Sequence, residues 1–92
     1  MIKSFKHKGL KEFFTTGSTK AIQANHAEKI KDQLQFLDAA HHVLDMDKPG
    51  YRLHELSGKL KGQWSIRVSG NWRIFFVFED GNAYIVNYED YH

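Results

Sequence analysis

The C-terminal third of the chain carries the pattern that most limits the fold: three strand-like runs separated by two turn signals. Apolar and polar side chains alternate over residues 63–68, which is typical of a β-strand with one buried face. Residues 69–71, Ser-Gly-Asn, predict a turn before a second run over residues 72–78. Residues 80–81, Asp-Gly, predict a tight hairpin before a third run over residues 83–88. We therefore expect a core built on an antiparallel sheet.

A short helix is predicted near the N-terminus, after a weak edge strand over residues 1–6. Residues 10–16 place apolar side chains at helical spacing, and Gly17 follows where a left-handed residue can end the helix. Phe13 and Phe14 are expected in the core rather than in a binding site.

A longer amphipathic helix is predicted over residues 27–46, where apolar side chains recur every three or four positions. Asn25 is placed to cap its N-terminus, and Glu28 completes the signature of a capping box. Pro49 and Gly50 supply the predicted stop.

Length and composition indicate one small domain over residues 1–92, with 41% hydrophobic residues and no cysteine. The lack of cysteine excludes a disulfide framework and fits a reducing cytoplasm. No apolar run approaches the ~18 residues of a membrane span, so neither export nor membrane insertion is expected.

Charge is distributed unevenly along the sheet region. Between residues 51 and 78 the only acid is Glu55, whereas the bases are Arg52, Lys59, Lys61, Arg67 and Arg73. Such a basic segment is a plausible nucleic-acid footprint. A solvated basic surface accounts for the same charges about as well.

The apolar faces of the first hairpin must coincide, and this predicts its register. The odd loop pairs Val68 with Trp72 and places Arg67 opposite Arg73. Like charges directly across a ladder repel each other, so an anion between the two guanidiniums is favoured. Guanidinium is suited to bidentate contact with phosphate.

The second hairpin is predicted to pair Phe78 with Ala83 through its two-residue turn. Continuing that register makes Tyr88 the cross-strand neighbour of Arg73. Phe75 and Val77 fall on the same face, where they would stack on a substrate base or be covered by a loop.

Asp90 and His92 are predicted to share this face with Arg73. Histidine is the natural acid or base near neutral pH, because its unperturbed pKa is ~6.5. With arginine to stabilise developing negative charge, the set suits metal-independent cleavage of RNA, in which the 2′-hydroxyl attacks the adjacent phosphorus.

The remaining helix histidines do not predict a metal site. His26, His41 and His42 include no pair three or four residues apart, and adjacent helical residues point about 100° apart. We expect all three at the surface or at the core boundary, and we expect no metal and no other cofactor.

Three segments together resemble the HigB-type toxins, a branch of the RelE/ParE toxin superfamily. They are Trp-Ser-Ile-Arg-Val at 64–68, Asn-Trp-Arg-Ile at 71–74 and Asn-Tyr-Glu-Asp-Tyr-His at 87–92. Residues 1–5 and 51–56 are similar too, so the likeness covers essentially the whole chain. Residues 51–56 also read as a short strand.

The resemblance implies an α+β fold, with two N-terminal helices packed on a small twisted antiparallel sheet. It also implies a cytoplasmic toxin that cleaves mRNA in the A site of the translating ribosome. The implied partner is a HigA-type antitoxin with a helix-turn-helix domain, through which the complex would bind its own operator DNA.

The resemblance also implies roles for particular residues. Asp90 and His92 are similar to the family's general acid and base, in an order left open, and Arg73 to its phosphate-stabilising cation. Supporting or substrate-positioning roles fall to His54, Asn71 and Tyr91. Contacts to the RNA backbone are expected from Arg67, Lys59 and Lys61.

One position departs from the family pattern. Relatives often carry lysine just before the loop glycine, where this chain has Ser57 before Gly58. Our hypothesis is that Lys59 or Lys61 supplies the missing charge.

Two other functions remain open from the sequence. A ParE-like inhibitor of DNA gyrase would share the fold without cutting RNA, although an acid/base set beside Arg73 favours the nuclease. The basic segment could also dock an acidic antitoxin without any catalysis.

Overall fold

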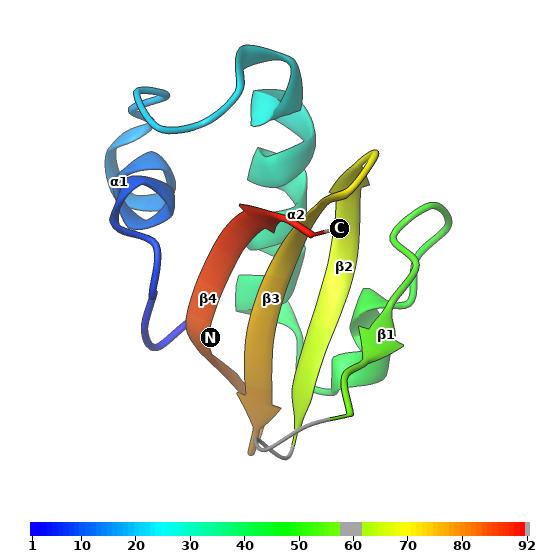
Figure 1. The fold of residues 1–92 in the computed structure, drawn as a ribbon. Helices are drawn as coiled ribbons and strands as arrows, with labels where there is room; N and C mark the ends of the chain where they lie inside the picture. The colour runs from blue at the N-terminus through cyan, green and yellow to red at the C-terminus, as the bar shows by residue number, and fades with distance from the viewer. Residues whose placement is uncertain (58–61, 92) are drawn as a thin grey trace.

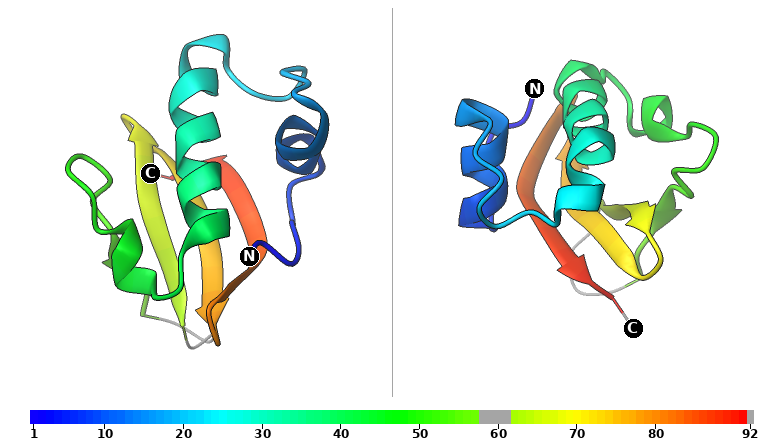
Figure 2. Two further views of the ribbon diagram at one scale, coloured as in Figure 1. Left: turned by 180° about the vertical axis from the view of Figure 1, so that it is seen from behind. Right: turned by 90° about the horizontal axis from the view of Figure 1, so that it is seen from above.

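A computed structural model describes residues 1–57 and 62–91 of the chain. Its elements are, in order, α1 (Lys8–Thr16), the 3-10 turn η1 (Ala24–His26), α2 (Ala27–Ala39), the 3-10 turn η2 (Val43–Met46), β1 (His54–Glu55), β2 (Gln63–Ser69), β3 (Trp72–Glu79) and β4 (Asn82–Asp90). The strands form one antiparallel sheet in the order β1-β2-β3-β4 (Figure 1). Both α-helices lie on the same side of this sheet (Figure 2). The predicted α+β fold is confirmed.

The core fills the space between the helices and the covered face of the sheet. Leu34 of α2 and Ile74 and Phe76 of β3 are at most 1% exposed. Trp64 and Trp72 are half-buried and pack against this core. Full burial of a leucine, isoleucine or phenylalanine side chain stabilises the folded state by roughly 1.5–3 kcal/mol. None of the helices within the described ranges is long and apolar enough to cross a bilayer.

Helix α1 begins two residues earlier than predicted because His7 caps it. The Leu10 backbone N–H donates to His7 Nδ1 at 2.9 Å. Gly17 ends the helix as predicted, with φ of 82° and its N–H bonded to the Phe13 carbonyl.

Helix α2 ends at Ala39, seven residues before the predicted end, so the predicted stop at Pro49 is wrong. The backbone of Ala40 is extended. Asp45 then accepts hydrogen bonds from the N–H groups of His41, at 3.0 Å, and His42, at 3.1 Å. These local bonds compete with helix continuation, and they lower the pKa of the Asp45 carboxyl, His42 contributing most.

The start of α2 also corrects a prediction. Asn25 does not cap it, because Asn25 lies inside η1. His26, the last residue of η1, is only 3% exposed, so its predicted surface or boundary position is wrong. His41 and His42 are exposed, as predicted.

The first hairpin has the predicted pairing of its two arginines and a β-bulge beyond it. Arg67 pairs with Arg73, but the register then shifts, so that Ser69 and not Val68 pairs with Trp72. The predicted Val68 pairing is therefore wrong. Val68 itself remains buried, at 1% exposure.

The second hairpin turns as predicted. Asp80 and Gly81 both have positive φ, 52° and 77°, which is the backbone of a two-residue type I′ turn. Phe78 pairs with Ala83 across it, also as predicted.

A second bulge interrupts this hairpin away from its turn. Val77 pairs with Tyr84, whereas Phe75 pairs with Asn87, so β4 contains one additional residue. Ile85 absorbs it with a φ of 47°, a left-handed conformation that is rare for a β-branched residue. A one-residue slip sends every following side chain to the opposite face.

The predicted contact between Tyr88 and Arg73 is wrong because of this bulge. Tyr88 pairs with Ile74 and is 3% exposed in the core, while Arg73 pairs with Glu89.

The N-terminal segment supports the bulge. Ser4 Oγ accepts from the Ile85 N–H at 2.8 Å, and the Ser4 carbonyl accepts from the Val86 N–H at 3.1 Å. Ile2 and Phe5 each form an isolated parallel bridge with β4. The predicted N-terminal edge strand is thus present only as two bridges.

Candidate functional site

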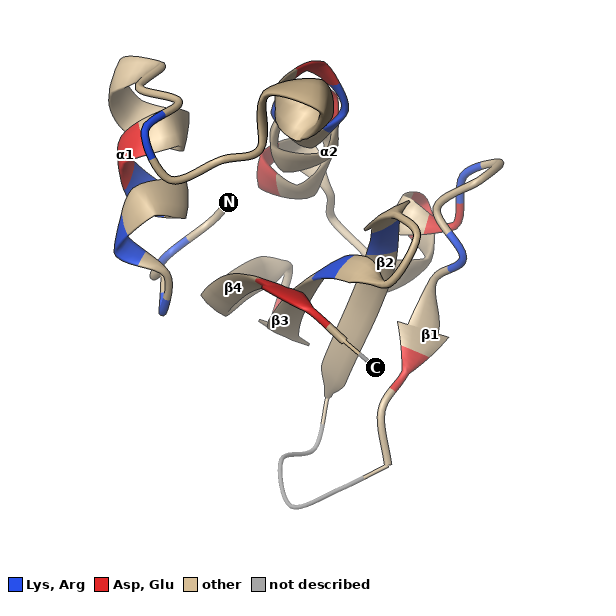
Figure 3. Cartoon of the chain, turned by 45° about the horizontal axis from the view of Figure 1, so that its top comes forward, with Lys and Arg blue, Asp and Glu red and all other residues tan. Residues whose placement is uncertain are grey.

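The candidate site lies near the beginning of β3 and the end of β4. β1 and the loop that precedes β1 form its other wall. In Figure 3, basic segments of the central strands lie close to the acidic end of β4. Two adjoining hollows, of about 390 and 510 Å³, occupy this region. They share Arg52, Arg73 and Tyr91 as lining residues.

Arg73 is the central cation of the site. It is half-buried on β3, and its Nη1 donates to Ser65 Oγ at 2.9 Å. Ser65 is 1% exposed, so its hydroxyl is a fixed acceptor. A guanidinium has five N–H donors, so this tether orients Arg73 while other donors remain available to an anion.

His54 reaches the same hollow from β1. It pairs with Ser65 across the β1–β2 ladder, and it is exposed. His54 and Arg73 both line the first hollow. The structure therefore places an accessible imidazole and a tethered guanidinium around one space, although the sequence separates them by almost twenty residues.

Tyr91 covers part of the open face of β3 next to Arg73. Its N–H donates to the Asn71 carbonyl at 2.8 Å, and its ring meets the Phe75 ring with centroids 5.5 Å apart. Phe75 is only 6% exposed. It is therefore covered, as one of the two predictions had it, but by Tyr91 and not by a loop. The Tyr91 side chain is 57% exposed and remains accessible from the hollow.

The second hollow contains the two residues around the first turn. Arg67 and Asn71 line it together with the three shared residues. Arg67 Nε donates to the Gly70 carbonyl at 3.2 Å, which holds the guanidinium over the turn. Among the described residues that line either hollow, none is acidic.

Sequence reasoning counted Arg52 only as one base in a basic segment and missed its place in the site. Arg52 lines both hollows. A short strand was predicted over residues 51–56, but β1 covers only His54–Glu55, and Arg52 precedes it with a left-handed backbone of φ 50°. Residues 49–52, Pro-Gly-Tyr-Arg, gave no signal for this placement.

Among the described residues, Asp90 departs from its predicted place. Asp90 pairs with Trp72, so alternation along β4 places it on the face opposite to that of Arg73, and its predicted shared face is wrong. His92, Lys59 and Lys61 lie outside the described residues.

A buried aromatic cluster lies beneath this end of the sheet. His26 Nδ1 and the Tyr88 hydroxyl are 2.7 Å apart and share a hydrogen bond. The Trp72 ring contacts both, with centroids 4.7 Å from Tyr88 and 5.7 Å from His26. Burial raises the pKa of Tyr88; burial and then Lys29 lower the pKa of His26. The cluster is satisfied internally, so we assign it to the fold and not to chemistry.

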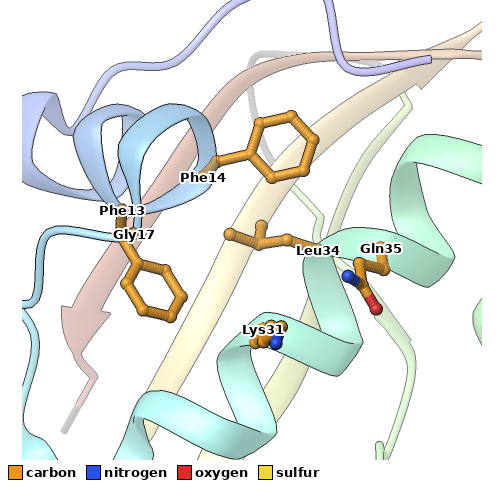
Figure 4. A pocket seen from close by; sticks show the side chains of 6 residues that line it. All are labelled: Phe13, Phe14, Gly17, Lys31, Leu34 and Gln35. Carbon is orange, nitrogen blue, oxygen red and sulfur yellow. The ribbon is translucent and has the colours of Figure 1, made fainter.

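A further hollow, of about 310 Å³, lies between α1 and α2 (Figure 4). Its walls include Phe13, Phe14 and Leu34, with Lys31 as the charged lining residue. Phe13 and Leu34 belong to the core and Phe14 packs against it, in agreement with their predicted core role. The lining offers no acid/base pair.

Comparison with known proteins identifies relatives along the whole chain. A protein from Proteus vulgaris named Endoribonuclease HigB is 51% identical over 92 residues, which cover 100% of both chains. Toxin HigB-1 of Vibrio cholerae serotype O1 (strain ATCC 39315 / El Tor Inaba N16961) is 35% identical over 85 residues, 90% of each chain. A family model described as RelE-like toxin of type II toxin-antitoxin system HigB matches residues 3–92.

Toxins of type II systems pair with an antitoxin, so an antitoxin is a partner of this chain. The resemblance seen in the terminal and central motifs is confirmed by these matches, and the chain belongs to the HigB-like family of RelE-like toxins.

Proposed function

We propose that this toxin is an endoribonuclease that cleaves mRNA on the translating ribosome. The observation that carries the proposal is the hollow in which tethered Arg73 faces accessible His54 and Tyr91. An RNA phosphate bound there would meet a fixed cation beside an imidazole, which are the parts that phosphodiester cleavage needs. The name of the Proteus vulgaris relative supports the same activity.

The proposed reaction needs no external nucleophile. A base removes the proton of the RNA 2′-hydroxyl, whose oxygen attacks the adjacent phosphorus. An acid then protonates the departing 5′-oxygen, leaving a 2′,3′-cyclic phosphate and a 5′-hydroxyl. Arg73 stabilises the additional negative charge on the phosphoryl oxygens in the transition state.

We assign the acid and the base to Asp90 and His92 on the family resemblance alone, because the pairing of Asp90 with Trp72 places it on the face opposite to that of Arg73. His54, Asn71 and Tyr91 position the RNA from the rim of the two hollows. Arg67 contacts the RNA backbone on the side of the first turn. Because His54 shares the hollow with Arg73, it is also the imidazole whose replacement best tests this arrangement.

The proposed partners follow from the same activity. The antitoxin is of the HigA type, with a helix-turn-helix domain through which the complex binds its operator DNA. The ribosomal A site presents the mRNA, so the toxin acts in the cytoplasm. Membership of a type II toxin family supports the antitoxin.

The alternative, a ParE-like inhibitor of DNA gyrase, has less support. A protein that only binds has no need for an imidazole beside a tethered guanidinium, and a curated relative is named an endoribonuclease.

Primer-extension mapping of a reporter mRNA in a purified translation system tests the proposal. The wild type should produce cuts within the reading frame that require translating ribosomes. His92→Gln and Arg73→Ala should lose them, while Lys11→Gln, an exposed site on α1, should cut normally. Absence of cuts by the wild type, with gyrase inhibition instead, would overturn the assignment.

A further inference from the structure

Arg52 occupies a position that no role assigned above explains. It lines both hollows together with Arg73 and Tyr91, so it lies where the two spaces adjoin. Arg67 lines the second hollow as well. Three guanidiniums thus surround a region whose described lining residues include no acid, which is an arrangement that attracts a polyanion.

The backbone of Arg52 is held in an unfavourable conformation. Its φ is 50°, in the left-handed region, directly after a turn in which Gly50 has φ of 84°. A non-glycine residue in this region costs on the order of 1–3 kcal/mol. Arg52 is exposed, so burial of its side chain does not offset that cost.

Buried Tyr51 holds Arg52 in this conformation. The Tyr51 carbonyl accepts from the Arg67 N–H at 2.6 Å, and the Tyr51 N–H donates to the Lys48 carbonyl at 3.0 Å. Tyr51 is 9% exposed. Arg52 is therefore fixed relative to β2, and through the Arg67–Arg73 pair relative to β3.

We propose that Arg52 binds an RNA phosphate next to the one stabilised by Arg73. The inference rests on the proposed function, which identifies the ligand as RNA. It adds a contact from Arg52 to a second phosphate of that RNA. The hydrogen bonds of Tyr51 hold the Arg52 backbone beside both hollows before RNA arrives, which reduces the backbone entropy lost on binding.

A binding measurement that does not depend on cleavage tests this assignment. The probe is a short single-stranded RNA with 2′-fluoro groups, which cannot attack the phosphate, and its fluorescence anisotropy is followed at several salt concentrations. Arg52→Asn should weaken binding about tenfold, as expected for loss of one charge-assisted contact. It should also reduce the slope of log affinity against log salt by about 0.7, the value for one phosphate contact on a single strand.

Two other variants separate the contact from general effects of charge. Arg52→Lys should keep the salt slope because it keeps the charge, and Lys11→Gln should keep both slope and affinity although it loses a charge. Asparagine tolerates the left-handed region, so Arg52→Asn should unfold at or above the wild-type temperature. Weaker binding by a protein that is at least as stable cannot come from unfolding.

The outcomes distinguish this inference from the proposed function. An unchanged salt slope in Arg52→Asn, or an equal loss in Lys11→Gln, would overturn the Arg52 contact even if the wild type cleaves mRNA. The expected loss in Arg52→Asn would support the contact even if the wild type proves not to cleave. No RNA binding by the wild type would overturn the contact.

Discussion

The two faces of the sheet use their polar side chains in opposite ways. On the helix-covered face, His26 and Tyr88 are buried, bond to each other and contact Trp72. On the open face, Arg73 and His54 line a hollow accessible to solvent. One pair is satisfied within the protein, whereas the other presents its groups outward.

The difference suggests that stability and activity can be changed separately in this small domain. A buried polar group left without its partner costs about 1–3 kcal/mol, so the covered face should govern folding. A half-exposed cation contributes little to stability but acts on charge that develops during reaction. Substitutions on the two faces should therefore produce opposite profiles of stability and activity.

The largest effect is expected for Arg73→Ala, which should reduce mRNA cleavage about 100-fold or more, as for removal of a transition-state donor elsewhere. Its thermal unfolding should stay close to wild type, because Ser65 lines the hollow and water that enters it can replace the Arg73 donor. Single-turnover cleavage on programmed ribosomes measures the loss, and Arg73→Lys should recover only part of it. Full activity of Arg73→Ala would remove the open face from the mechanism.

Tyr88→Phe should give the reverse profile. Removing the hydroxyl leaves buried His26 without its 2.7 Å partner, so stability should fall by about 1–2 kcal/mol. A loss of 1 kcal/mol lowers the melting temperature of a domain of this size by roughly 4–8 °C. Cleavage per folded molecule should remain at the wild-type level. A drop in activity without a drop in stability would break the division between the faces.

The sequence predicted the elements of the sheet but not the faces of β4. Strict alternation from Ala83 would bury every second residue. The structure instead buries Ala83, Val86 and Tyr88, and the step of three between the first two marks the bulge at Ile85. The bulge depends on Ser4, which is far away in sequence, so no local pattern could place it.

The site was predicted better where it depends on local register than where it depends on loops. The Arg67–Arg73 pairing followed from the first hairpin alone and is confirmed. The face of Asp90 required the register of β4 and was predicted wrongly. Arg52 was missed because its own backbone is left-handed. Such a conformation leaves no periodic pattern in the sequence.

Substitution of Ile85 tests whether the left-handed backbone at the bulge of β4 destabilises the fold. Its left-handed backbone costs about 1 kcal/mol or more, and its side chain is 40% exposed, so little burial is at stake. Ile85→Asn should therefore raise the free energy of unfolding by about 1 kcal/mol, because asparagine tolerates this conformation. Urea unfolding measures the gain, with Ile85→Val as the matched variant that keeps the strain. A destabilised Ile85→Asn would mean that the isoleucine side chain, and not strain relief, dominates at the bulge.

The smallest expected effect concerns the pH dependence of the covered face. Burial, with a further contribution from Lys29, lowers the pKa of His26 in the folded protein. The unfolded chain, in which histidine has a pKa of about 6.5, therefore binds more protons than the folded chain as pH falls. Stability contributed by neutral His26 should be complete above that unfolded pKa and should be lost as pH falls below it.

Urea unfolding from pH 8 to pH 5 measures this slope, with His26→Gln as the control. The other histidines, including exposed His54, are unchanged in the control, so the difference between the two curves belongs to His26. The stability of the wild type relative to His26→Gln should be constant at alkaline pH and should decrease as the pH falls below about 6.5. Parallel curves would show that His26 takes up a proton as easily in the folded protein as in the unfolded chain, and the covered face would then be as open to protons as the face that carries Arg73.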